Sequence, residues 1–455
     1  MRRILYIALA AFAICSCGQS VTKDPTLWIT DEELASRNAL DFTRDSADVV
    51  EYLLKYYPDL TAEQVAAWES TNALENMMID GQKRYFRNGP RNLFRIDPAA
   101  REVYYAAEPQ YVAEDKEECM AKDDYCRSVV AAARATGKNL LMPKKFTVLF
   151  EIKVKPDVVP AGETVRAWIP FPREDQNSIT DVKLLETSEK EYILSPDEAS
   201  VHKSVYMEKK AVAGEPTVFT SKFTFTTYAE WYDLKAEDIK PYDTQSALYK
   251  EYTAERERHV IFTDRIRAIT DSLVGSETNP YLKVRSIYSW IVANYPWASA
   301  REYSTIENIP MYVLANNHGD CGQVGLLLIT MCRYAGVPAR WQSGFEMADD
   351  SAGMHDWAEI YYEGIGWVPT DVSFGRGRTN AKDEEDVFMF YTRGLDAYRW
   401  IANSDFGGKF YPEKKFIRSE TVDFQRGEVE WAGGNLYYMN QWSGWPIEVT
   451  SENLY

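Results

Sequence analysis

Cys321 is the residue whose type and setting best suit nucleophilic chemistry. It lies in the segment GDCGQ, residues 319–323, and opens an apolar run that stops at Gly336. The run predicts a buried helix with Asp320 as its N-cap and Gly336 as the left-handed residue after its end. A thiol in the first helical turn lies at the positive end of the helix dipole, which lowers its pKa. We therefore expect a reactive thiolate at Cys321.

A thiol nucleophile needs a base within hydrogen-bond reach, and the chain has only 4 histidines. We expect His202, in a predicted sheet, and His259, in a charged predicted helix, to be solvated surface residues. His318 precedes Cys321 by three residues, but its tight turn offers the ring no partner. His355 begins a predicted strand at a sheet end, where an imidazole can reach a helix N-terminus. His355 is therefore the favoured base.

Asp371 is the predicted partner that orients His355, because it ends the next strand of a predicted hairpin. Direct pairing of the two residues leaves residues 362–364 as a three-residue loop. Its last residue, Gly364, would take the left-handed conformation that such loops require. This register places both side chains on one face, whereas a slip of one residue would separate them.

Further motifs accompany the cysteine segment in a fixed order: RYAGVPAR at 333–340, HDWAEI at 355–360 and GWVPTD at 366–371. Together they resemble the bacterial transglutaminase-like superfamily over roughly residues 280–375. Upstream, RAWIPFP at 166–172 resembles the β-domain that often precedes this core. The resemblance implies a papain-like α+β fold.

The resemblance assigns roles to three residues. Cys321 becomes the nucleophile, His355 the general base and acid, and Asp371 the orienting carboxylate. Asp320 departs from the expected pattern, because a charge beside the thiol raises its pKa. The backbone N–H of Cys321 would serve the oxyanion hole. The second donor stays open among Gln323, Asn317, Trp290 and Trp297.

The fold class expected for the whole chain is α+β, with a papain-like transglutaminase core, a preceding antiparallel β-sandwich and an N-terminal helical domain. Strict alternation from Phe146 to Val154 indicates a half-buried strand, which favours the sandwich. The predicted divisions are a signal peptide (1–17), a helical accessory domain (18–143), the sandwich (144–235), the catalytic core (236–380) and an aromatic-rich C-terminal region packed on the core (381–455).

The first residues resemble a bacterial lipoprotein signal. Arg2 and Arg3 precede an apolar stretch, residues 4–14, that is too short for a permanent membrane span. The sequence around Cys17 then fits lipidation of that cysteine. We expect a protein of the bacterial cell envelope, anchored by lipid to the outer membrane or the periplasmic face.

The other cysteines have different expected roles. The cell envelope is oxidising, so Cys119 and Cys126 are candidates for a local disulfide. Cys332 lies on the same helical face as Cys321 but about 16 Å further along the helix, because the rise is 1.5 Å per residue. It is predicted to be a core thiol.

Composition narrows the partners and the reaction. A formal net charge of −18 argues against a nucleic-acid partner. No cofactor and no metal are expected, because histidines are few and no cluster has ligand spacing. The predicted reaction is thiolate attack on the amide carbonyl of a peptide, protein or peptidoglycan-like substrate to form a thioester. Hydrolysis is favoured; acyl transfer to an amine and a non-catalytic glycan- or peptide-binding scaffold are the alternatives.

Overall fold

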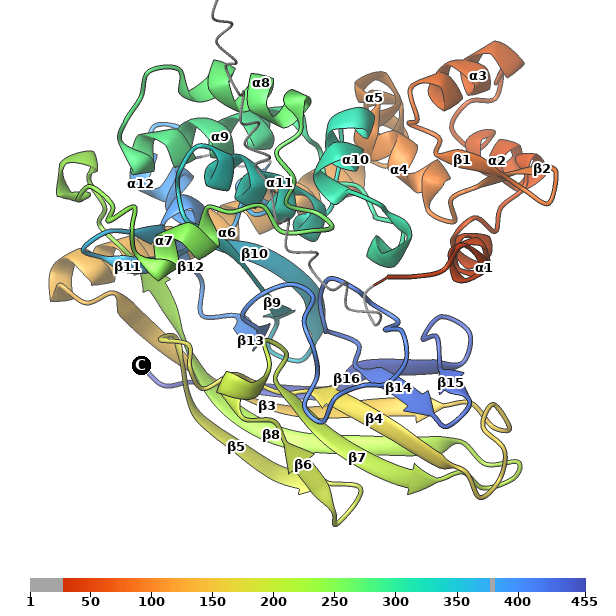
Figure 1. Cartoon of the computed structure of the whole chain (residues 1–455). Helices are drawn as coiled ribbons and strands as arrows, with labels where there is room; N and C mark the ends of the chain where they lie inside the picture. The colour runs from red at the N-terminus through yellow and green to blue at the C-terminus, as the bar shows by residue number, and fades with distance from the viewer. Residues whose placement is uncertain (1–27, 377–380) are drawn as a thin grey trace, which may run out of the picture.

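The computed structural model describes residues 28–376 and 381–455, so the predicted signal peptide and Cys17 lie outside the described residues. Figure 1 shows three layers, with the helices from α8 (Asp264–Val274) to α11 (Cys321–Tyr334) above a central sheet and two larger sheets below it. The first five described helices of the chain, between residues 31 and 107, stand to one side of these layers. Among the described residues, no helix combines the length and the apolar content that a membrane span requires.

The N-terminal region is built from short capped helices and one long one. Asp45 and Thr61 each begin a helix with a reciprocal capping box, which satisfies backbone donors that the helix leaves free. Leu53, Leu74 and Leu93 are fully buried in a separate small core. The elements are α1 (Asp31–Asp41), α2 (Ser46–Leu53), α3 (Ala62–Ser70), β1 (Asn76–Ile79), β2 (Gln82–Tyr85), α4 (Gly89–Ile96), α5 (Pro98–Ala107) and α6 (Pro109–Thr136).

Helix α6 excludes the predicted disulfide between Cys119 and Cys126. Neither cysteine is part of a disulfide, and both lie within this one continuous helix. Seven residues of helix separate their Cα atoms by about 10 Å along the axis, whereas a disulfide needs roughly 4.4–6.8 Å. The prediction is wrong because it rested on the oxidising compartment and did not take account of the distance that a helix places between the two cysteines.

Two antiparallel sheets form the predicted sandwich. The first has the strand order β12-β8-β3-β16, with β5 also pairing with β8, and the second has the order β15-β14-β4-β7-β6. Four of these strands come from the C-terminal segment: β12 (Gly394–Leu395), β14 (Glu428–Trp431), β15 (Gly434–Asn435) and β16 (Trp442–Asn453). The alternation predicted from Phe146 is confirmed: Phe146 and Val148 are fully buried and pair with Phe225 and Phe223 of β8. The strands of this region are β3 (Leu140–Val154), β4 (Thr164–Pro170), β5 (Ile179–Thr187), β6 (Tyr192–Leu194), β7 (Ser204–Lys210) and β8 (Thr217–Trp231).

The central layer combines helices with a four-stranded antiparallel sheet of order β11-β10-β9-β13. Helix α11 is buried from Gly322 to Arg333, as its apolar sequence predicts, and packs against β10 and β9. The elements are α7 (Ala247–Tyr252), α8 (Asp264–Val274), α9 (Pro280–Asn294), α10 (Ile309–Asn316), α11 (Cys321–Tyr334), β9 (Ala339–Met347), β10 (Ala352–Tyr362) and β11 (Gly366–Thr370).

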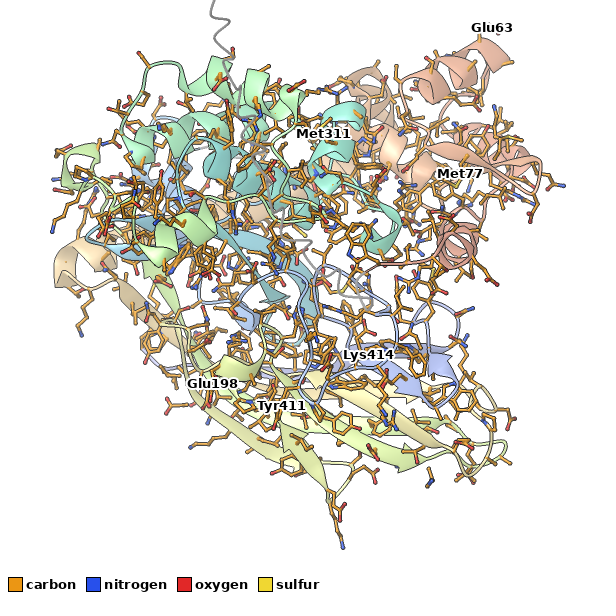
Figure 2. The ribbon with its side chains drawn as sticks, viewed as in Figure 1. Glu63, Met77, Glu198, Met311, Tyr411 and Lys414 are labelled. Atoms are coloured by element: carbon orange, nitrogen blue, oxygen red, sulfur yellow. The ribbon has the colours of Figure 1, made fainter. Side chains whose placement is uncertain are left out.

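The C-terminal segment contributes a strand or more to each of these three sheets. Trp400 on β13 stacks on Phe345 of β9, with ring centroids 4.4 Å apart, and lies 6.1 Å from Phe150 of β3. Lys414, labelled in Figure 2, is buried 3.3 Å from Glu430 Oε2 where the segment crosses the sandwich. Its elements are α12 (Glu385–Phe388), β12 (Gly394–Leu395), β13 (Arg399–Asn403), β14 (Glu428–Trp431), β15 (Gly434–Asn435) and β16 (Trp442–Asn453).

Candidate active site

Cys321 is the first residue of helix α11, as predicted. Asp320 caps the helix: its carboxylate accepts a hydrogen bond from Gln323 N at 3.0 Å, and the Gln323 side chain accepts one from Asp320 N. Gly336 follows the last turn with φ +75°, in the predicted left-handed conformation. The N–H of Cys321 lies in the first turn of the helix, where backbone donors have no partner within the helix.

His355 on β10 and Asp371 just after β11 form a hydrogen-bonded pair, with 2.6 Å between His355 Nε2 and Asp371 Oδ2. Both side chains are nearly or fully buried. The ring of His355 packs against Phe374 with centroids 4.5 Å apart. Because Nε2 faces the carboxylate, the pair favours the tautomer that carries the proton on Nε2 and leaves Nδ1 as the proton acceptor.

The strand register differs from the prediction. Ala358 pairs with Thr370 and Tyr362 with Gly366, so continued pairing would place Asp371 opposite Trp357 and not opposite His355. The predicted direct pairing is wrong by two residues. The offset is even, so His355 and Asp371 still project from the same face and meet diagonally. The turn is residues 363–365, and Gly364, at φ +84°, stands in its middle.

Asp371 is fixed by partners that the sequence did not reveal. Its Oδ1 accepts a hydrogen bond from Phe374 N at 3.0 Å, and Arg399 Nη1 lies 3.1 Å from its Oδ2. Arg399 belongs to β13 and also binds Asp396. Burial alone would raise the pKa of Asp371, but the charges of His355 and Arg399 outweigh burial and lower it. Asp371 is therefore held as a carboxylate.

Asp356 is a second carboxyl group in contact with the thiol, and the sequence analysis missed it. Its Oδ2 lies 3.5 Å from Cys321 Sγ, and its Oδ1 accepts a 2.8 Å hydrogen bond from Gln425 Nε2. Tyr303 bridges the acids beside the thiol, because its hydroxyl lies 2.7 Å from Asp320 Oδ1 and 3.4 Å from Asp356 Oδ2. The adjacent position of Asp356 and His355 in the chain was the available signal.

The electrostatics of the thiol oppose the prediction from the helix dipole. Burial, followed by the charges of Asp356 and Asp320, raises the pKa of Cys321 well above its usual value. Burial and the charge of Asp320 likewise raise the pKa of Asp356. Cys321 and His355 are not hydrogen-bonded to each other in this structure, although both line one cavity. A nucleophilic role for this thiol would therefore require a base that accepts its proton.

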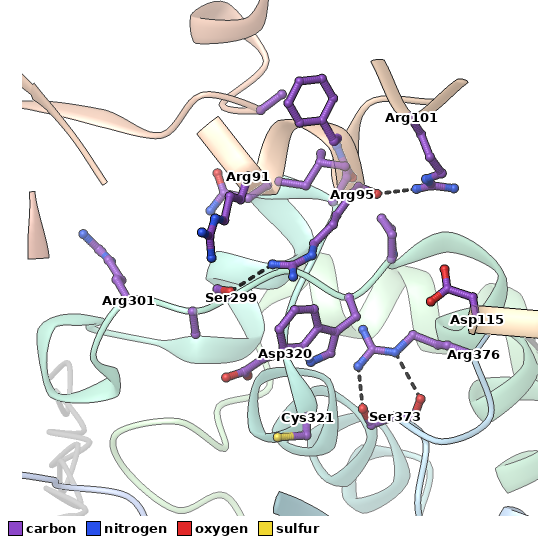
Figure 3. Close-up of a pocket in the computed structure, with 18 of the residues that line it drawn as sticks. Arg91, Arg95, Arg101, Asp115, Ser299, Arg301, Asp320, Cys321, Ser373 and Arg376 are labelled. Carbon is purple, nitrogen blue, oxygen red and sulfur yellow. Dashed lines mark hydrogen bonds between the residues drawn. The ribbon is translucent and has the colours of Figure 1, made fainter. Parts of the chain in front are cut away.

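The cavity above Cys321 has a volume of about 1790 Å³, and the N-terminal helices, the central layer and the C-terminal segment all line it. Figure 3 shows Cys321 below a set of arginine side chains. Of the four candidates for the second oxyanion donor, Asn317 and Trp297 line this cavity, whereas Gln323 and Trp290 do not. The described residues contain no group of three or more His, Cys, Asp or Glu side chains placed to hold a metal ion.

The other histidines do not face the thiol. His202 and His259 are buried, so the prediction of solvated rings is wrong. His202 lies 2.7 Å from Asn403 Oδ1, across a gap of 201 residues, and burial lowers its pKa. The segment around His259 is a bridged loop rather than a charged helix. His318 Nδ1 bonds to Asn316 O, and burial lowers the pKa of His318 to about 4.

The sequence of the central layer has a match among known families. Residues 267–372 match the transglutaminase-like superfamily. An uncharacterized protein of Haemophilus influenzae is 25% identical over 158 residues, which are 29% of this chain and 42% of that relative. The chain thus spans less than half of the length of this relative. The transglutaminase-like core confirms the predicted α+β class.

Two solved structures resemble the chain more loosely. The structure named "Putative Cysteine Protease from Cytophaga hutchinsonii" aligns with 69% of this chain and 99% of its own, at 14% identity and a TM-score of 0.41. The periplasmic domain of TgpA from Pseudomonas aeruginosa aligns with 50% of this chain and 88% of its own, at 12% identity and a TM-score of 0.26. At these scores the two structures carry no information about the reaction.

Proposed function

We propose that this protein is a cysteine protease or amidase that uses Cys321, His355 and Asp371. The observation that carries the proposal is the 2.6 Å contact between His355 Nε2 and Asp371 Oδ2, at a cavity that also exposes the first residue of α11. An imidazole oriented by a carboxylate, on the same cavity as a thiol at a helix N-terminus, provides the groups that nucleophilic catalysis requires.

The proposed reaction has two steps, formation of a thioester and its hydrolysis. The Cys321 thiol gives its proton to His355 Nδ1 as the sulfur attacks the amide carbonyl carbon, and the backbone N–H of Cys321 stabilises the oxyanion. The C–N bond breaks, the amine leaves with the proton from His355, and a thioester remains. Water then gives a proton to His355 as its oxygen attacks the thioester. The C–S bond breaks, and the thiol regains its proton. Asp371 stabilises the imidazolium in both steps.

The size of the cavity supports hydrolysis over acyl transfer to an amine. Transfer requires that water be kept from the thioester, whereas a cavity of about 1790 Å³ is larger than the usual 300–1,000 Å³ of a small-molecule pocket and admits water with a peptide. The intact pairing of His355 with Asp371 also favours an enzyme over a passive peptide- or glycan-binding scaffold.

The location and the substrate class follow from the sequence. We place the protein in the bacterial cell envelope, tethered by lipid at Cys17 to the outer membrane or the periplasmic face. There it would meet the amide bonds of peptides, proteins or peptidoglycan-like polymers. This part of the proposal rests on the N-terminal sequence motif.

The test compares wild-type protein with Cys321→Ala on a panel of peptides and peptidoglycan fragments, each with and without an added primary amine. We expect wild-type turnover to acid products and loss of turnover in Cys321→Ala with an unchanged circular dichroism spectrum. Cys332→Ala, in the same helix but away from the cavity, serves as the matched control and should retain activity. Equal activity of Cys321→Ala would refute the mechanism, and products joined to the amine would reassign it to acyl transfer.

A further inference from the structure

One wall of the cavity carries arginine side chains from the N-terminal helices. Arg91 and Arg95 lie on α4, four residues apart and so on one helical face, and Arg101 lies on α5. All three line the cavity that contains Cys321. Figure 3 shows them above Cys321, with Arg376 beside it. We call Arg91, Arg95 and Arg101 the arginine wall.

The guanidinium groups of the arginine wall have no carboxylate within ion-pair distance among the described residues. Arg95 Nη1 reaches Ser299 Oγ at 3.1 Å, and its guanidinium lies over the Trp297 ring at 4.6 Å. Arg101 binds the backbone carbonyl of Arg95. Burial and the neighbouring charge of Arg91 together lower the pKa of Arg95. Like charges are thus held close together without a counter-charge.

The acidic side chains along the same wall already have partners. Asp97 caps α5 through Ala100 N at 2.8 Å, and Asp115 accepts a hydrogen bond from Tyr105. Glu108 accepts one from Gln110, and Glu118 lies 3.9 Å from Lys122. The chain carries a net charge of −18, so acids to neutralise arginines are abundant. The unpaired arginine wall is therefore a local arrangement and not a result of composition.

The arginine wall is fixed relative to the nucleophile. Asn92, on α4 between the arginines, exchanges two hydrogen bonds with the backbone of Ser299, at 2.8 and 3.0 Å. Opposite, Arg376 donates to Gly319 O at 2.7 Å, just before the cysteine helix, and also lacks a carboxylate partner among the described residues. A ligand over Cys321 would therefore meet positive charge from the arginine wall and from Arg376, whereas Asp320 and Asp356 line the cavity next to the thiol itself.

We propose that the arginine wall binds carboxylate side chains of an acidic peptide substrate, at positions flanking the amide that Cys321 attacks. Guanidinium groups pair with carboxylates through two parallel hydrogen bonds, which gives both strength and orientation. Two exposed aromatic side chains that line the cavity, Tyr111 and Trp297, offer apolar surface for the rest of the peptide. This inference rests on the proposed function, because it names the substrate class of that site.

The experiment measures kcat/KM on matched peptides that carry Glu, Gln or Lys near one common scissile amide. We expect the Glu peptide to be preferred over the Gln peptide by about 10- to 100-fold, the range for a hydrogen bond to a charged group, and the preference to weaken with added salt. Arg91→Gln and Arg95→Gln should each reduce the preference. Arg84→Gln on β2 removes the same charge outside the cavity and should leave the preference unchanged.

Binding to the Cys321→Ala variant separates this inference from the proposed function. Fluorescence anisotropy of the labelled Glu peptide should show salt-sensitive binding that Arg91→Gln weakens. Such binding without any turnover by wild-type protein would defeat the proposed function and keep the inference. Turnover with equal kcat/KM for the Glu, Gln and Lys peptides would defeat the inference and keep the function. The wild-type peptide series also decides the matter if an arginine variant fails to fold.

Discussion

At the scale of single residues, Asp356 is the charged group that most strongly raises the pKa of the Cys321 thiol. Its Oδ2 lies 3.5 Å from Cys321 Sγ, and an ionised carboxylate there opposes the formation of the thiolate. The same contact has a different effect once Asp356 is protonated, because a neutral carboxyl group removes the repulsion. Since the pKa of Asp356 is raised by burial and by Asp320, the neutral form persists to higher pH than for an ordinary aspartate. The ionisation states of Asp356 and Cys321 are therefore coupled.

Asp356→Asn should make Cys321 more reactive at pH values where Asp356 is ionised, because it removes a charge that raises the pKa of the thiol. Since the pKa of Asp356 is itself raised, alkylation of Cys321 by iodoacetamide is followed from about pH 6 to about pH 10. We expect it to accelerate by about tenfold at the alkaline end, which corresponds to about one pKa unit. The measurement is the labelling rate of the Cys321 peptide by mass spectrometry. Asp350→Asn, in an exposed turn, is the matched control. An unchanged or slower rate in Asp356→Asn would show that the carboxyl group does not oppose the thiolate.

At the scale of helices and strands, Gly322 allows the start of helix α11 to approach its neighbouring strands closely. A Cβ atom at Gly322 would lie 2.6 Å from Asp356 Oδ2 and 2.8 Å from the Trp341 ring. The helix start therefore packs against β9 and β10 more closely than any side chain would permit. This close approach brings Cys321 into contact with Asp356, so the sequence Cys321-Gly322 has a packing reason as well as a chemical one.

Gly322→Ala should destabilise the protein by about 1–3 kcal/mol, the usual cost of forcing an extra carbon into a packed core. Gly325→Ala is the matched control in the same helix, because its Cβ would meet Trp341 at 3.7 Å, an ordinary contact. Alanine favours helix over glycine, so Gly325→Ala should be neutral or stabilising by up to about 1 kcal/mol. Thermal unfolding followed by circular dichroism measures both effects. Similar losses in both variants would contradict the close approach at Gly322.

Local sequence patterns predicted the positions of helices and strands better than the pairing of residues between strands. Both ends of α11 follow from Asp320 and Gly336, because capping chemistry is local. The hairpin pattern predicted the shared face of His355 and Asp371 correctly but misplaced the pairing by two residues. Two glycines, at 364 and 366, both have positive φ, so the sequence alone did not decide which one the turn would centre on.

At the scale of the whole molecule, the contacts between segments that lie far apart in the chain could not be predicted from the sequence. Arg399 supports Asp371 from β13, and Gln425 reaches Asp356 across 69 residues. Arg95 contacts Ser299 across 204 residues. His202 was expected to be a solvated residue of the predicted sandwich, but it is fully buried and contacts Asn403 of the C-terminal segment. No hydrophobic period or turn signal encodes such pairings, since they depend on how separate layers close over one another.

Beside the thiol, carboxyl groups converge from three parts of the chain: Asp320, which is half-buried, and Asp356, Glu420 and Asp423, which are buried. Burial raises the pKa of each, most strongly for the last three. Between the unfolded pKa, about 4, and the raised folded pKa, the folded state binds more protons than the unfolded state. Stability contributed by these groups is therefore lost as pH rises through that window.

The variant Asp423→Asn separates the effect of Asp423 on the pH dependence of stability from the effects of the other titrating groups. Buried histidines act in the opposite direction below pH 6.5, because the folded pKa is lowered to about 3 for His259 and about 4 for His318. The histidines are the same in wild type and in the variant, so their contribution drops out when the two unfolding free energies are subtracted. We expect the variant to gain stability relative to wild type between pH 5 and 8, by at most about 1.4 kcal/mol per pH unit. Urea unfolding at each pH measures the difference, and the exposed Asp383→Asn should give a flat line. A flat line for Asp423→Asn as well would show that Asp423 is ionised throughout this range.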